Sequence, residues 1–163
     1  MPSLCTLYFS LVYPYLQYGT IVWGSTYKTT LNRLVVLRKR IIRVITKSCF
    51  DAPSVPLFYE HNFLNSSNIY MLQIGLFMFF FKNKLLPASF HGMFLSSSQL
   101  YSYHTRNAMI YRFQFSRTNF RKFTIVHQGP KFWNTLPAEL SLTSKNVFKK
   151  NLHRFLVQQA DLS

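Results

Sequence analysis

Apolar and basic residues between positions 31 and 47 recur at the period of an α-helix. The apolar positions, three or four residues apart, are Leu34, Leu37, Ile41 and Ile45. The basic positions are Arg33, Arg40, Arg43 and Lys47. At about 100° per residue the two sets lie on nearly opposite faces of one helix. The pattern therefore predicts an amphipathic helix with a basic polar face.

Two other stretches are more apolar, but neither is both long and uninterrupted. The first is LVYPYLQYGTIVWG at residues 11–24, and it is interrupted by Pro14, Gln17 and Gly19. A signal peptide would need basic residues before its apolar stretch, but the first basic residue of this sequence is Lys28. The second, residues 69–81, has thirteen residues, whereas a membrane-spanning helix needs about 20. We expect a helix over residues 4–18, a buried core helix over residues 66–84 and no stable membrane insertion.

The last part of the chain shows a different pattern. After a loop at residues 87–102, aromatic and polar residues alternate as they do in strands. We expect two short strands, residues 108–115 and 122–127, to form a hairpin. Ser144 is a favourable N-cap for a final amphipathic helix that ends near residue 158.

Together these elements predict a mostly α-helical chain of the α+β class. We expect a helical bundle over residues 1–86 and a loop or linker over residues 87–102. A short basic, aromatic β-hairpin and a C-terminal amphipathic helix are expected over residues 103–163. A chain of 163 residues with 48% hydrophobic residues is long enough for one domain and too apolar for a disordered basic tail.

The charge balance indicates a polyanionic partner. Nineteen Lys and Arg face four Asp and Glu, which gives a formal net charge of +15 and a pI near 10.2. Such a field favours nucleic acid first and an anionic membrane surface second. The basic face of the helix at residues 31–47 has no acid for an intrahelical pair, so its charges repel one another and favour an external anion. The alternatives are an ordinary solvated face and a basic soluble protein without a defined site.

A second group of cations lies among aromatic residues in the predicted hairpin. These cations are Arg106, Arg112, Arg117, Arg121 and Lys122. Guanidinium groups contact phosphates, and aromatic rings stack on bases. Aromatic residues in strands are more often part of a core, however, so the sequence leaves base stacking as the less favoured interpretation.

Residues for catalysis or metal binding are not grouped in the sequence. Asp51 and Asp161 are the only aspartates, and 110 residues separate them, whereas metal-dependent nucleotidyl transfer needs clustered carboxylates. Cys5 and Cys49 form no CxxC pair and have no histidine at metal-binding spacing, which fits a reducing compartment. We expect no catalytic residue, no metal site and no cofactor.

Three stretches resemble one family. LYFSLVYPYLQYGTIVWG, followed by a helix ending in RIIRVIT, is similar to the region after the palm of non-LTR (LINE-type, jockey-like) retrotransposon reverse transcriptases. LYSYHTRN and QGPKFWNTLP resemble the end of the same proteins. The resemblance covers about residues 4–156. It implies a helical thumb that grips the template–primer backbone, followed by a carboxy-terminal extension.

This sequence lacks several parts of that family. It has no fingers, no palm with Y-x-D-D aspartates, no amino-terminal endonuclease and no carboxy-terminal Cys/His knuckle. The resemblance therefore implies a non-catalytic fragment that binds RNA or DNA backbones with low sequence specificity, in the nucleus or cytoplasm. A reverse transcriptase palm is a further implied partner, against which residues 11–24 would pack. Two alternatives are a translated mobile-element relic with no selected function and a basic membrane-associated protein.

Overall fold

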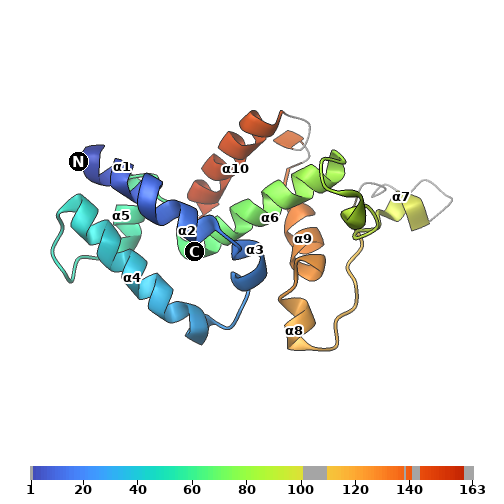
Figure 1. Ribbon diagram of the computed structural model, residues 1–163, viewed down its shortest axis with the longest axis horizontal. Helices are drawn as coiled ribbons and strands as arrows, with labels where there is room; N and C mark the ends of the chain where they lie inside the picture. The colour runs from blue at the N-terminus through green and yellow to red at the C-terminus, as the bar shows by residue number, and fades with distance from the viewer. Residues whose placement is uncertain (1, 101–109, 138, 141–143, 160–163) are drawn as a thin grey trace. The chain divides into compact units, whose positions relative to one another are not determined.

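The computed structural model describes residues 2–100, 110–137, 139–140 and 144–159. Helices dominate these residues (Figure 1), which confirms the mostly helical class. The chain divides into two compact units. Unit 1 comprises Met1–Tyr70 and His153–Ser163, and unit 2 comprises Met71–Leu152.

Short helical elements open unit 1, where the sequence predicts a helix that ends near Gly19. They are α1 (Pro2–Leu7), the π-helical turn η1 (Tyr8–Val12), α2 (Tyr13–Gln17) and α3 (Thr20–Trp23). Gly19 turns the chain between α2 and α3 with φ of 64°, a left-handed conformation that glycine adopts without steric cost. Across this turn the indole N–H of Trp23 donates to the carbonyl oxygen of Tyr18 at 2.9 Å. The stretch YGTIVWG therefore forms a turn at Gly19 followed by the short helix α3.

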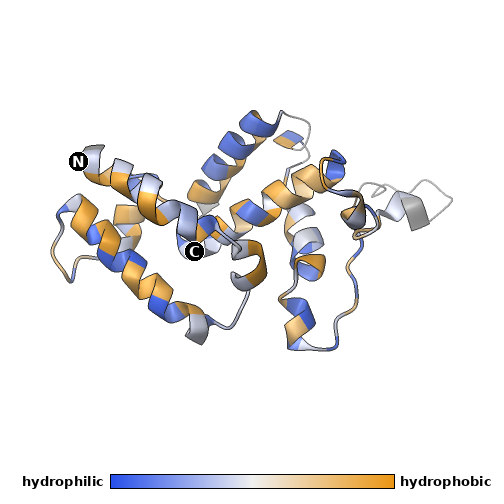
Figure 2. Cartoon of the chain, in the orientation of Figure 1, coloured by the Kyte–Doolittle hydropathy of each residue, from blue (hydrophilic) through white to orange (hydrophobic). Residues whose placement is uncertain are grey.

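The predicted amphipathic helix is confirmed as α4 (Lys28–Thr46), but its apolar face is rotated from the predicted one. Ile42 and Ile45 are buried, whereas Leu37 is 53% exposed. The buried face therefore passes through position 38 instead of position 37. Figure 2 shows hydrophobic and hydrophilic residues alternating along α4, as expected of an amphipathic helix with one apolar and one polar face.

The long apolar helix is confirmed as α6 (Ser66–Lys82), and α5 (Ser54–Glu60) precedes it. Two short elements follow, η2 (Ala88–Phe90) and α7 (Ser97–Leu100). Among the described residues, no helix combines the length and the apolar character needed to cross a membrane.

The predicted final helix is confirmed as α10 (Lys145–Gln159). At its start the N–H of Phe148 donates to the carbonyl oxygen of Ser144 at 2.8 Å. The Phe148 side chain is fully buried and stacks on Phe79, with ring centroids 4.5 Å apart. Its centroid lies 5.9 Å from that of Trp133. These three rings form an aromatic centre of the unit 2 core.

The predicted β-hairpin is wrong. The described residues contain no strand, only an isolated antiparallel bridge between Ser96 and Tyr111. Two helices, α8 (Asn119–Lys122) and α9 (Ile125–Trp133), occupy the positions of the second predicted strand. Residues 108 and 109 of the first predicted strand lie outside the described residues.

Side-chain hydrogen bonds explain why this region is not a hairpin. The hydroxyl oxygen of Thr118 accepts the N–H of Arg121 at 3.4 Å and so caps the start of α8. The Asn134 amide pairs with the main chain of Tyr111, accepting its N–H at 3.2 Å and donating to its carbonyl oxygen at 2.9 Å. The Asn134 contacts use the main-chain groups of Tyr111 that a strand partner would need, and the Thr118 cap begins a helix within the predicted hairpin loop.

The stretch GPKFWN has a packing role in unit 2. Gly129, Pro130 and Trp133 are buried on α9. A Cβ atom on Gly129 would lie 2.9 Å from the sulfur of Met78, so any larger residue would have to displace the Met78 side chain. With the Asn134–Tyr111 pair, four residues of one sequence motif hold α9 and the preceding loop in place.

The close packing around Gly24 generates a prediction. A Cβ atom there would lie 2.5 Å from the carbonyl oxygen of Thr20 and 2.6 Å from the Tyr70 ring, and both residues are buried. Gly24→Ala should therefore lower the free energy of unfolding by about 1–3 kcal/mol. Gly92→Ala is the control, because nothing lies within 4 Å of its Cβ position. Urea-induced unfolding followed by circular dichroism measures both, and equal midpoints would contradict the predicted clash.

Candidate nucleic-acid interface

The basic face of α4, defined as Arg33, Arg40, Arg43 and Lys47, lies opposite the buried side of the helix. Arg33, Arg40 and Lys47 are exposed. Ile42 and Ile45, on the other side, are only 2% and 5% exposed. The predicted basic face is therefore a surface, and three of its four cations are accessible to a ligand.

Arg43 differs from the other three because part of its side chain has a structural task. It is half-buried, and its Nε donates to the carbonyl oxygen of Ala52 at 2.8 Å. This bond ties the end of α4 to the loop that follows. Lys47 closes the helix in a left-handed conformation, with φ of 56°, and its N–H points back to the carbonyl oxygens of Arg43 and Val44.

The charge around α4 is almost wholly positive. The helix contains six Lys and Arg and no Asp or Glu. Within the described residues of unit 1 the carboxylates are Asp51 and Glu60, both exposed. The basic residues of α4 therefore have no acidic partner on their own helix.

Arg38, which also belongs to α4, lies inside unit 1 and is 3% exposed. Its guanidinium donates to Ser66 Oγ at 2.9 Å, to Tyr8 Oη at 3.0 Å and to the carbonyl oxygen of Leu64 at 2.5 Å. The guanidinium carbon also lies 5.3 Å from the centroid of the Phe58 ring. The Arg38 side chain of α4 therefore contacts η1, α5, the loop before α6 and the start of α6.

Among the residues that the structure describes, no carboxylate contacts Arg38. Burial raises the pKa of nearby Tyr13, and Tyr8 raises it further, while a hydrogen bond with Gln17 and the charge of Arg38 lower it. The net shift in this pKa is upward, so Tyr13 stays neutral at physiological pH and supplies no counterion. The Nε atom of Arg38 is buried and has no hydrogen-bond partner within the described residues. Neutral acceptors and an aromatic face thus hold this cation.

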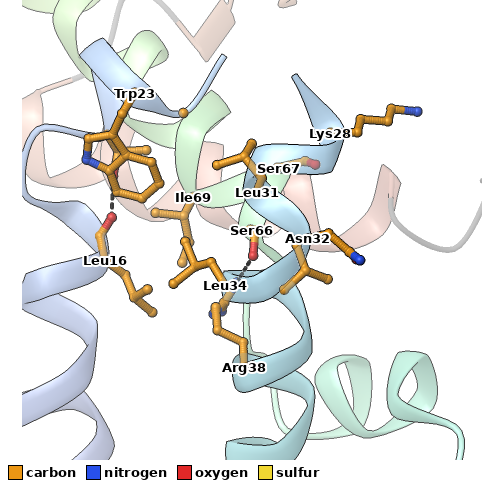
Figure 3. Close-up of a pocket in the computed structure, with 13 residues that line it drawn as sticks. Leu16, Trp23, Lys28, Leu31, Asn32, Leu34, Arg38, Ser66, Ser67 and Ile69 are labelled. Carbon is orange, nitrogen blue, oxygen red and sulfur yellow. Dashed lines mark hydrogen bonds between the residues drawn. The ribbon is translucent and has the colours of Figure 1, made fainter. Parts of the chain in front are cut away.

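A cavity of about 280 Å³ lies beside Arg38 within unit 1. Figure 3 shows Leu16 and Trp23 on one side of it and Leu31 and Leu34 of α4 on the other. Arg38 lies at one end, bonded to Ser66 (Figure 3). The guanidinium is thus committed to the protein interior and is not part of the basic face.

The second predicted cation group lies in unit 2. Arg112, Arg117, Arg121 and Lys122 are exposed, and Arg106 lies outside the described residues. Arg121 donates from Nη2 to Oε1 of Gln114 at 3.0 Å, and Lys122 Nζ lies 3.5 Å from Oδ1 of Asn119. Arg121 and Lys122 thus make polar contacts within their own segment while remaining exposed.

The described residues contain no group of three His, Cys, Asp or Glu that could hold a metal ion. Both cysteines are free, with Cys5 half-buried and Cys49 exposed. Comparison of the chain with protein-family models, curated proteins and solved structures finds no match. No related protein therefore assigns a role to the two cation groups, and their role must be inferred from their exposure and contacts.

Arg38 is the important residue that the periodicity of α4 did not single out. A signal was present, because position 38 lies four residues after Leu34 and four before Ile42, on one face of the helix. An arginine within an apolar face predicts either a buried cation or a break in the face. The predicted apolar face included Leu37, so Arg38 belonged to neither the predicted apolar face nor the predicted basic face.

The burial of Arg38 generates a second prediction. Arg38→Ala should lower the free energy of unfolding by about 2–4 kcal/mol, because it opens a cavity and leaves the Leu64 carbonyl without its donor. Arg40→Ala removes the same side chain from an exposed position and should change stability by no more than about 0.5 kcal/mol. Urea-induced unfolding compares the two variants. Equally small effects would show that Arg38 does not hold unit 1 together.

Proposed function

We propose that the chain binds the sugar–phosphate backbone of RNA or DNA with low sequence specificity. This is the role of the thumb and carboxy-terminal region of the LINE-type reverse transcriptases that its sequence resembles. In this proposal the chain is non-catalytic and contributes grip on a template–primer. The observation that carries the proposal is the exposed basic face of α4.

The spacing of the basic face suits a nucleic-acid backbone. Arg33 and Lys47 are fourteen residues apart, which corresponds to about 21 Å along an α-helix. That length matches roughly six base-pair steps of a duplex. Phosphate contacts of this kind position a protein on nucleic acid but carry no sequence information. Low specificity therefore follows from the chemistry of the face.

The exposed apolar residues of the N-terminal helices support the second part of the resemblance. Leu11 is 60% exposed, Tyr15 80% and Val22 85%. Burying large apolar side chains stabilises a protein, and exposed groups of them commonly mark contact surfaces. We propose that a reverse transcriptase palm covers this segment.

The basic face is tested by replacing Arg33, Arg40 and Lys47 together with glutamine. Glutamine retains helix propensity, and Arg43 stays because it supports the loop through Ala52. The triple variant should bind a DNA duplex and an RNA–DNA hybrid more weakly than the wild type. The slope of log affinity against log salt should flatten by about 0.9 for each phosphate that the variant no longer neutralises. Fluorescence anisotropy over a salt series measures both quantities.

The matched control removes the same formal charge from α10. Lys149, Lys150 and Arg154 are exposed there, and their triple replacement with glutamine leaves α4 intact. A larger loss of affinity and slope in the α4 variant supports a defined grip. Equal losses would show that net charge alone drives binding, and absence of binding by the wild type at low salt would overturn the proposal.

A further inference from the structure

We propose that unit 2 carries a stacking platform for unpaired bases, formed by Phe115 and Phe120 with the cations beside them. The chain would therefore prefer single-stranded nucleic acid to a duplex at this site. This inference rests on the proposed nucleic-acid binding and adds the kind of strand that is bound. It concerns unit 2 alone and is independent of the basic face of α4.

The two rings are at the surface, where the hairpin prediction favoured a core. Phe115 is 88% exposed and Phe120 is 82% exposed. Other rings of unit 2 are buried, such as Phe94 at 4% and Trp133 at 8%. Within the described residues, neither exposed ring stacks on another ring of the protein. Their faces are therefore available to a planar partner.

Buried polar contacts direct Phe115 outward. The next residue, Ser116, is buried, and its Oγ lies 3.3 Å from Nδ1 of His127. The same hydroxyl donates to the carbonyl oxygen of Gln114 at 3.4 Å. Ser116 is thus anchored inward, while its neighbours Phe115 and Arg117 are exposed. The exposure of Phe115 is thus held by the structure around it.

The helix α8 places the second ring. Thr118 caps this helix by accepting the N–H of Arg121, and Arg121 in turn donates to Gln114 at 3.0 Å. These bonds link α8 to the segment that carries Phe115. Phe120 lies between the cap and Arg121 on this short helix, and its ring faces solvent.

The charge of the segment identifies the partner. Arg112, Arg117, Arg121 and Lys122 are all exposed, and the sequence contains no Asp or Glu between Glu60 and Glu139. Exposed rings among cations match a single strand, in which phosphates pair with cations and unstacked bases cover the rings. The bases of a duplex are already stacked on one another, so a duplex would use the cations alone.

The test compares a labelled oligothymidylate and an oligouridylate with a DNA duplex of the same length. Phe115→Leu/Phe120→Leu keeps apolar side chains but removes both aromatic faces. It should weaken binding to both single strands by at least about tenfold, since each stacked base contributes roughly 5- to 150-fold. Duplex affinity should change by less than about twofold, as expected of a surface substitution that does not touch the ligand. Fluorescence anisotropy measures the affinities, and circular dichroism checks that the variant is folded.

Two further variants sharpen the result. Phe115→Trp/Phe120→Trp should keep single-strand affinity, and its tryptophan fluorescence should be quenched more than that of the wild type when a strand binds. Phe50→Leu removes an aromatic side chain of unit 1 that is 77% exposed. This control should leave single-strand binding unchanged.

The outcomes separate the inference from the proposed function. If the Phe115/Phe120 leucine variant binds single strands like the wild type, the stacking platform is overturned and the rings are left as a protein-contact surface. Equal losses for single strand and duplex also overturn it. In both cases the proposed function stands if the α4 variant still weakens duplex binding. A wild type that binds neither duplex nor single strand overturns the proposed function itself.

Discussion

The buried guanidinium of Arg38 is the constraint on which the arrangement of unit 1 depends. Taking an arginine out of water costs several kcal/mol, and no carboxylate repays that cost here. Hydrogen bonds to a charged donor contribute about 1.5–3 kcal/mol each, and a desolvated contact with an aromatic face contributes about 2 kcal/mol. Tyr8, Leu64, Ser66 and Phe58 must therefore all meet the cation at once. Because only these contacts together offset the burial of the Arg38 guanidinium, they favour one arrangement of the segments that supply them.

The position of Arg38 also determines what α4 presents to solvent. With position 38 turned inward, Arg33, Arg40 and Lys47 lie on the far side of the helix and are exposed. Arg43 lies between these roles, because its side chain is half-buried and its Nε donates to the Ala52 carbonyl oxygen. One helix thus divides its cations between support of the fold and a face for an anion.

A similar division operates in unit 2 with neutral groups. The Asn134 amide satisfies both main-chain groups of Tyr111, and Ser116 is anchored at His127. These inward contacts hold the loop without a strand partner. Tyr111 packs against Phe81 and Phe94, whereas Phe115 has no cross-strand neighbour to bury it and stays at the surface.

By itself the sequence determined where the long helices lie and that Arg33 and Arg40 are exposed, because these features depend on periodicity over one or two turns. The helices α4, α6 and α10 form where they were expected, although the buried face of α4 includes Arg38 instead of Leu37. Only the tertiary structure decided that Arg38 is buried and that the chain beyond Tyr111 does not form a hairpin. The acceptors of Arg38 lie 26 to 30 residues away, and Asn134 lies 23 residues from Tyr111. No local pattern records such pairings, because they exist only once the chain has folded.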